Sequence, residues 1–179
     1  RGVLIHSTLA VDAEDGEVLG LLGQDVWVRT VDTHRGEKRE AYRKRRRESQ
    51  KWIDGIERTA TSGLSGQVVI AVFDREGEIF EAIEMLRSRG LSFVIRACQN
   101  RLLATGGYSM ETVRNAELVG LMEVEIPARP GVPKRSARLA VRRTIIEIAP
   151  PLLRKRRGNP LRVGVVAAIE EAPPIGVEP

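Results

Sequence analysis

The 179-residue chain is 42% hydrophobic with a net charge of +5, a composition typical of a folded domain and not of a chain disordered throughout. Aromatic residues make up only 4%, so the core must be built mainly from Val, Ile, Leu and Ala, which suits an α/β or all-β interior. One cysteine and two histidines exclude an internal disulfide and a metal finger, and no apolar run approaches the roughly 20 residues that span a bilayer.

The opening residues predict where the protein resides and what precedes it. No signal peptide is recognisable, so we expect a soluble, cytoplasmic protein without a membrane segment. The chain begins on Arg1 and enters a strand pattern at once. We therefore expect it to be an internal piece of a longer protein.

The first predicted elements are a hairpin and a helix. Apolar residues dominate 3–12 and 18–29, and the Asp15-Gly16 pair between them is a strong hairpin signal. These stretches predict two antiparallel strands. A helix with one buried face, ending before residue 62, is predicted from apolar residues at helical spacing: Trp52, Ile53 and Ile56.

A strand, a helix and a second strand follow. Residues 68–73 are six successive apolar residues, which predict a strand buried on both faces at the centre of a helix-covered sheet. Asp74 comes where that strand ends, and a second strand is predicted at 91–96. The helix between them is predicted from apolar residues at helical spacing and a C-terminal glycine: Ile79, Ile83, Leu86 and Gly90. The unit is predicted to be a right-handed parallel crossover.

From Cys98 onward the sequence becomes rich in β-branched residues and is punctuated by prolines. Cys98 itself is expected to be a small buried apolar residue. Residues 108–118 predict a short helix. Strands are predicted at 121–126, 137–148 and 161–169.

Positive charge is concentrated in two segments. Residues 35–48 hold eight Lys or Arg against three Glu, and residues 129–162 hold eleven against one, so the segments sum to +5 and +10 on an otherwise acidic chain. Concentrated positive charge favours a polyanion partner such as nucleic acid. The alternative is that both segments are solvated loops.

Asp74 is the leading candidate for a chemical role. An acidic residue at the carboxyl end of a central strand lies where open α/β sheets place their ligands, and a carboxylate is a hard ligand suited to Mg²⁺. The alternative is that Asp74 caps the following helix through backbone N–H groups. The sequence contains no phosphate-binding loop of the nucleotide-hydrolase type, and the predicted hairpin does not suit a phosphatase or a signalling receiver.

Six short blocks carry a family resemblance. They are VLIHSTL at 3–9, GLL at 20–22, VWVR at 26–29, ESQKW at 48–52, DRE at 74–76 and FVIR at 93–96. In this order and spacing they resemble the insertion-sequence transposases with an Asp-Asp-Glu triad, the group that contains the enzyme of the kanamycin-resistance composite transposon. The resemblance covers essentially the whole chain.

The resemblance implies an α/β fold in two parts. An incomplete ribonuclease-H-like core, a mixed sheet with helices, would span residues 1–97, and a β-rich insertion subdomain would span residues 98–179. Asp74 would be the second of three catalytic carboxylates and a metal ligand. In the family the first Asp lies on a preceding strand and the Glu in a later Tyr-Arg-Glu-Lys helix, and neither is matched here. We therefore expect this chain alone to leave DNA intact.

The implied activity of the parent protein is DNA cleavage and joining in cut-and-paste transposition. Its partners would be transposon ends and target DNA, and it would act as a homodimer. Two Mg²⁺ or Mn²⁺ ions held by the three carboxylates would activate water, then the freed 3′-hydroxyl, for attack on phosphodiesters. Two alternatives stay open: a non-catalytic DNA-binding remnant of a truncated transposase, and a nuclease of the same fold.

The candidates for DNA contact are Arg96 and Arg101, which match basic positions near the family's active site, and Lys51. The basic runs 43–47 and 154–157 are generic phosphate-binding sequences or solvated loops. Three further residues are interpreted as packing groups and not as ligands or stacking platforms: His6, Trp27 and Trp52.

Overall fold

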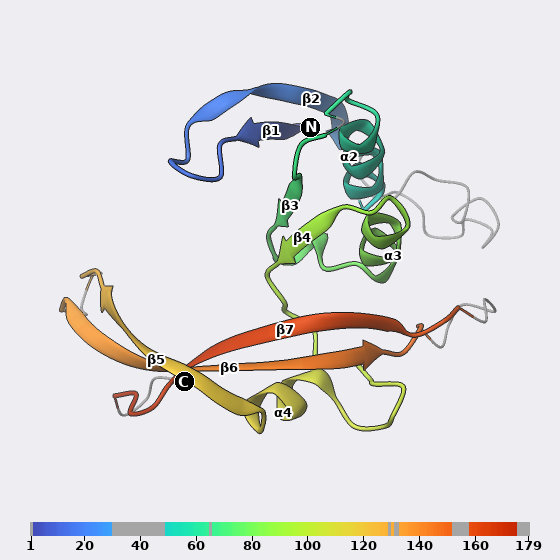
Figure 1. Ribbon diagram of the computed structural model, residues 1–179. Coiled ribbons are helices and arrows are strands. Elements are labelled where there is room, and N and C mark those ends of the chain that lie inside the picture. The colour runs from blue at the N-terminus through green and yellow to red at the C-terminus, as the bar shows by residue number, and fades with distance from the viewer. Residues whose placement is uncertain are drawn as a thin grey trace. The chain divides into compact units, whose positions relative to one another are not determined.

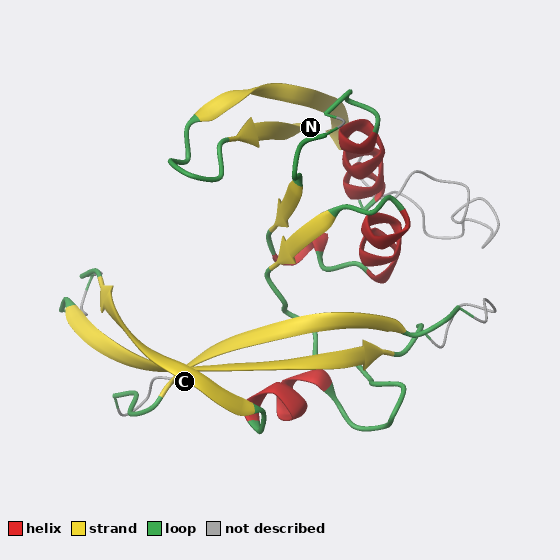
Figure 2. Ribbon diagram, viewed as in Figure 1, coloured by secondary structure: helices red, strands yellow, loops and turns green. Residues whose placement is uncertain are grey.

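The computed structural model describes residues 2–29, 49–64, 66–128, 130, 133–151 and 158–174. Over these residues the protein is of the expected mixed α/β class, with three separate sheets and few helices (Figure 1; Figure 2). The chain divides into two compact units, Arg1–Cys98 and Gln99–Pro179. None of the helices in the described ranges is long and apolar enough to cross a membrane. The basic runs 43–47 and 154–157 lie outside the described residues.

The first unit opens with the predicted hairpin, which is confirmed. Strand β1 (Gly2–Val11) pairs antiparallel with β2 (Val18–Arg29) (Figure 1). The register runs from Gly2 opposite Arg29 to Val11 opposite Val18. The Asp12 amide closes the turn by donating to the Glu17 carbonyl oxygen at 2.8 Å. Gly16 has φ +80°, a left-handed conformation that costs glycine little.

One face of the hairpin is apolar and exposed. Successive side chains of a strand point to opposite faces, so cross-strand partners gather on one side. Ser7 and Gln24 interrupt this face, and the Gln24 amide donates to the Ser7 hydroxyl at 3.0 Å. The other pairs on it are exposed Val, Ile and Leu residues: Val3 with Val28, Ile5 with Val26, Leu9 with Leu21, and Val11 with Val18.

The opposite face of the hairpin packs against α2 (Gln50–Ala60), which confirms the predicted helix. The Trp52 ring lies edge-on to His6 of β1, with 4.9 Å between ring centroids. The Arg58 guanidinium donates to the Asp25 carboxylate of β2 at 2.6 Å. Ile56, only 2% exposed, points into the core on the helix's buried side.

The predicted strand-helix-strand unit is also confirmed. Strand β3 (Ile70–Phe73), helix α3 (Phe80–Ser88) and strand β4 (Ser92–Ile95) follow one another, and β3 pairs parallel with β4 (Figure 2). Helices α2 and α3 cover one face of this two-stranded sheet. The core there is formed by buried residues of the two helices and inward-facing residues of the strands: Ile56, Ala82, Leu86, Ala71, Phe73, Phe93 and Ile95.

The prediction that residues 68–73 form a strand buried on both faces is wrong. Val68 precedes β3, and Val72 on β3 and Val94 on β4 are 72% and 61% exposed. Only the face that carries Ala71 and Phe73 meets the helices. A run of apolar residues has the composition of a central strand, but burial of its second face requires a covering layer, and α2 and α3 both lie on the same side.

The expected mixed sheet over residues 1–97 does not form as one sheet in the described residues. Strands β1 and β2 make one two-stranded sheet, and β3 and β4 make another. The two sheets share helix α2, because Trp52 contacts His6 of β1 on one side and Phe73 of β3 on the other, with 4.9 Å between ring centroids in each case.

The second unit is a three-stranded antiparallel sheet with one short helix. Helix α4 (Ser109–Arg114) precedes β5 (Glu117–Ile126), β6 (Arg135–Ile148) and β7 (Leu161–Glu170), in the order β5-β6-β7 (Figure 2). The helix is shorter than the predicted 108–118 because its last predicted residues belong to β5. The buried apolar residues of this unit come from α4, the preceding loop and the strands: Leu103, Val113, Ala137, Ala140, Ile146, Ile148 and Leu161.

Candidate functional site

Asp74 lies directly after β3, where the strand leaves the sheet. Its backbone is extended, with φ −78° and ψ −171°, and it precedes a single 3-10 turn, η1 (Arg75–Gly77). The carboxylate oxygen Oδ1 accepts the Glu76 amide at 3.0 Å. Asp74 therefore does cap the turn, as the alternative interpretation predicts. Capping does not exclude metal coordination, because a carboxylate has two oxygens and several lone pairs.

The turn after Asp74 folds back tightly beneath the end of β3. A Cβ atom placed at Gly77 would lie 2.7 Å from the Phe73 Cβ, well inside contact distance. Gly77 is buried, so the neighbouring atoms have little room to move. Only glycine allows this approach, and the approach fixes the direction in which the chain leaves Asp74.

Arg96 lies beside Asp74. In the parallel register Phe73 pairs with Ile95, and the Arg96 amide donates to the Phe73 carbonyl oxygen at 3.0 Å. Asp74 and Arg96 are thus the next residues after two hydrogen-bonded neighbours, at the carboxyl ends of both strands. Both residues are exposed. This edge is where parallel α/β sheets place their ligands.

Lys51 reaches the same turn from α2. Its Nζ donates to the Glu76 carboxylate at 2.8 Å, and the ammonium lies 5.3 Å from the centroid of the Trp52 ring. The Lys51 side chain is 19% exposed and that of Glu76 is 69% exposed. The structure therefore brings Lys51, Asp74 and Arg96 to one end of the β3 and β4 pair.

Arg101 belongs to the second unit, and Asp74 belongs to the first. The Arg101 backbone is tied to the start of α4. The Arg101 amide donates to the Ser109 hydroxyl at 2.9 Å, and the Ser109 amide donates to the Arg101 carbonyl oxygen at 2.8 Å. Arg101 is thus not assigned to the site at Asp74.

Glu78 and Cys98 join the two loops of this edge, which sequence reasoning missed. The Cys98 amide donates to the Glu78 carboxylate, and the Cys98 thiol donates to the Arg75 carbonyl oxygen at 3.4 Å. Cys98 is exposed, so the prediction of a buried residue is wrong: it follows β4 in a loop and not in the core. Glu78 resembles any acidic residue near a helix start, and only its burial marks it out.

His6 is a packed residue, as expected. Its Nδ1 is buried and has no hydrogen-bond partner within the described part of the chain. Burial lowers the pKa of His6 below its usual 6.5, and the nearby Lys51 ammonium lowers it further. Trp52, wedged between His6 and Phe73, is likewise a packing residue.

The described residues do not make up a metal centre on their own. Asp74 supplies a hard oxygen ligand, but the described ranges contain no group of three His, Cys, Asp or Glu side chains arranged to hold a metal ion. A site of the two-metal kind would therefore need carboxylates from elsewhere.

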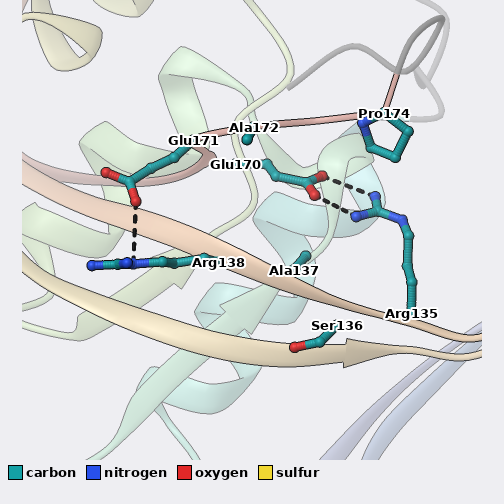
Figure 3. Close-up of a pocket in the computed structure, with 8 residues that line it drawn as sticks. All are labelled: Arg135, Ser136, Ala137, Arg138, Glu170, Glu171, Ala172 and Pro174. Atoms are coloured by element: carbon teal, nitrogen blue, oxygen red, sulfur yellow. Dashed lines mark hydrogen bonds and ion pairs between the residues drawn. The ribbon is translucent and has the colours of Figure 1, made fainter.

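A polar pocket in the second unit is a weaker candidate. It lies between β6 and the end of β7, and the Arg135 guanidinium donates to both carboxylate oxygens of Glu170 (Figure 3). Arg138 forms a second ion pair, with 3.3 Å between its Nε and Glu171 Oε2. The two acids balance the two cations, so the pocket offers little attraction to an anion.

No protein-family model matches the sequence.

Proposed function

We propose that this chain is part of a DNA transposase of the Asp-Asp-Glu type and that the carboxyl ends of β3 and β4 are its DNA-facing edge. The observation that carries the proposal is the adjacency of Asp74 and Arg96 on hydrogen-bonded parallel strands. Lys51 approaches the turn that follows Asp74. Asp74 at a strand end, with Arg96 at the end of the neighbouring strand and Lys51 paired to Glu76 in the next turn, suits a metal ion and the phosphodiester it acts on.

The three residues divide two tasks between them in this proposal. Asp74 supplies one oxygen ligand to Mg²⁺, and the other carboxylates come from segments outside this sequence. The bound metal supplies Lewis-acid activation of the attacking oxygen. Arg96 and Lys51 neutralise DNA phosphates and hold the backbone in register, without reading base sequence.

A ribonuclease-H-like fold is part of the same proposal. Among the described strands, β1 pairs with β2 alone and β3 with β4 alone. Neighbouring strands lie about 4.8 Å apart, so two strands that flank a third are roughly 9.5 Å apart. Trp52 contacts side chains of both β1 and β3, which suits one strand between them. Such a strand would merge the two sheets into one mixed sheet covered by α2 and α3.

One observation favours a second candidate, a DNA-binding domain without catalysis. The Asp74 carboxylate already accepts the Glu76 amide, and a helix cap alone explains an aspartate at this position. In that case Arg96 and Lys51 still bind phosphate, and Asp74 has no metal ligand role.

The first test is DNA binding by the chain as it stands. Anisotropy titrations of labelled duplex DNA at several salt concentrations should give an affinity that falls steeply with salt, at a slope of about −0.9 per neutralised phosphate. Arg96→Ala should weaken binding several-fold. It should also reduce the magnitude of the salt slope by about one, the contribution of a single phosphate contact. Affinity that is absent at low salt or indifferent to salt would contradict the proposal.

A matched control is available on α3. This helix begins after the Asp74 turn and ends at Ser88 just before β4 begins, so the exposed Arg87 lies near the opposite end of the strands. Arg87→Ala removes the same charge as Arg96→Ala. We expect it to leave the affinity and the salt slope close to those of the wild-type chain. Equal effects of the two variants would mean that DNA affinity depends on the net charge of the chain and not on the position of a cation at this edge.

A further inference from the structure

Glu78 is an unusual residue for its surroundings. Among the described residues it is the only charged side chain that is buried, at 6% exposure. It follows the η1 turn and precedes α3, four residues after Asp74. A buried carboxylate is costly unless hydrogen-bond donors replace the lost water.

One donor lies in the loop that follows β4. The Cys98 amide donates to Glu78 Oε2, a charge-assisted hydrogen bond of the stronger kind. The Cys98 thiol donates to the Arg75 carbonyl oxygen at 3.4 Å, within the turn that Glu78 ends. Two contacts thus join the loop after β3 to the loop after β4.

Arg96 lies between two fixed points of its own chain. On one side its amide donates to the Phe73 carbonyl oxygen, the last link of the β3 and β4 ladder. On the other side, two residues later, Cys98 is held by Glu78. The Glu78 contact thus restrains the chain two residues after Arg96, together with the contact between the Cys98 thiol and the Arg75 carbonyl oxygen.

We infer that Glu78 is a positioning residue that holds Arg96 beside Asp74 by fastening the loop after β4 to the turn after β3. The inference rests on the proposed function, because it assigns a purpose to the adjacency of those two residues. Glu78 acts through the backbone of Cys98 and contacts neither DNA nor metal.

The single cysteine allows the link to be tested chemically. Cys98 is the only thiol in the sequence, so its rate of reaction with a chromogenic aromatic disulfide reports on this loop alone. Glu78→Ala should speed the reaction several-fold, because the released loop exposes the thiol more fully. Glu78→Gln keeps an acceptor oxygen for the Cys98 amide and should restore a rate within about twofold of wild type. Glu84→Ala, at an exposed glutamate of α3, should not change the rate.

The same variants are then titrated with labelled duplex DNA at low salt. Glu78→Ala should lose much of the affinity that Arg96→Ala loses, and the two changes combined should be less than additive. Glu78→Gln should bind DNA nearly as well as the wild-type chain. This rescue separates positioning from the loss of a negative charge, since removing an acid should otherwise favour DNA binding in both variants.

The link, the positioning role and the proposed function would each fail with a different experimental result. A folded Glu78→Ala chain with unchanged Cys98 reactivity overturns the link. A faster thiol reaction with undiminished DNA affinity overturns the positioning role and leaves the proposed function standing. Failure of the wild-type chain to bind DNA overturns the proposed function and the positioning role together. If Glu78→Ala does not fold, hydrogen exchange of the Cys98 amide in the wild-type and Glu78→Gln chains decides, and an unprotected amide in both overturns the link.

Discussion

The two units of this protein use charged residues in different ways. In the second unit, three described basic residues of β6 and its approach are matched by acids: Lys134 by Glu125, Arg135 by Glu170, and Arg138 by Glu171. In the first unit Lys51 is likewise paired, with Glu76, whereas Arg96 forms no ion pair within the described residues and lies with Asp74 at one exposed end of a parallel strand pair.

The difference shows why charge summed along a sequence is a poor measure of binding charge. The acids that pair with Lys134, Arg135 and Arg138 lie at 125, 170 and 171, outside the segment 129–162 that sums to +10. That sum therefore overstates the positive charge that the segment offers to DNA. An exposed cation at a strand end beside a carboxylate, as Arg96 is beside Asp74, is the stronger indication of a phosphate site.

The largest expected effect belongs to Asp74. In a protein that supplies the two further carboxylates of the proposed site, Asp74→Asn should fold and bind transposon-end DNA but lose strand cleavage by several orders of magnitude, because it would remove a charged ligand of the proposed metal. Asn caps about as well as Asp, so a purely structural Asp74 would tolerate the change. Cleavage can be followed on labelled DNA with Mg²⁺ or Mn²⁺. A cleavage rate within about threefold of the parent, a change of roughly 0.7 kcal/mol in the activation barrier, would mean that Asp74 is not a ligand in the proposed site.

The next largest effects are expected from glycine substitutions, which should change the free energy of unfolding differently in the two units. Gly77→Ala forces a Cβ to within 2.7 Å of the Phe73 Cβ and should lower the free energy of unfolding by about 1–3 kcal/mol, as overpacking does. Gly164→Ala on β7 meets nothing within 4 Å, so it should be neutral or stabilise the strand by up to about 1 kcal/mol. Urea denaturation of both variants measures the contrast. A harmless Gly77→Ala would mean that the turn after Asp74 is not tightly packed.

Removing cations from the second unit should affect DNA binding less than removing Arg96. The double variant Arg135→Gln and Arg138→Gln breaks two ion pairs, and it also leaves two acids without their partners. We expect a small decrease in affinity and a smaller change in salt slope than Arg96→Ala gives in the same titration. A loss that exceeds that of Arg96→Ala would place the main DNA contact in the second unit.

The smallest expected effects are in pH dependence, and the two units should respond in different ranges. The pKa of His6 is lowered below 6.5, by burial first and then by Lys51, so the unfolded chain binds more protons as the pH falls through that value. The free energy of unfolding should then decrease on going below pH 6.5. The pKa of Glu170 is lowered below 4.5, chiefly by the hydrogen bond from Arg135, so its contribution is present above pH 4.5 and is lost as the pH falls further.

Denaturation curves at a series of pH values, with His6→Phe and Glu170→Gln beside the wild-type chain, measure both ranges. His6→Phe should abolish the decrease between neutral pH and pH 5 while leaving the acid range unchanged. Glu170→Gln should abolish its own contribution to the decrease in the acid range and leave the decrease between neutral pH and pH 5 unchanged. An identical profile for the wild-type chain and His6→Phe would mean that His6 does not become protonated on unfolding in this range.

Local sequence signals predicted the elements well and the tertiary contacts poorly. The Asp15-Gly16 pair and the spacing of Trp52, Ile53 and Ile56 are properties of a few neighbouring residues, and the hairpin and α2 formed where they indicated. The parallel pairing of β3 with β4 also formed as predicted, and it places Asp74 and Arg96 after the ends of neighbouring strands.

What could not be predicted depends on residues far apart in the chain. The apolar run at 68–73 does not reveal which of its faces is covered. The hydrogen bond from Cys98 to Glu78 joins residues 20 positions apart, and neither residue type signals it. Arg101 is near Arg96 in sequence, but the division of the chain after Cys98 separates them into different units.

The exposed apolar face of the hairpin has a practical consequence for the purified protein. Its Val, Ile and Leu pairs, on a two-stranded sheet, resemble the surfaces by which sheets adhere to one another. Concentrated samples should therefore associate and precipitate, more strongly at high salt, where charge repulsion is screened. Binding and unfolding are best measured in dilute solution, after light scattering has established the protein concentrations at which the chain is monomeric.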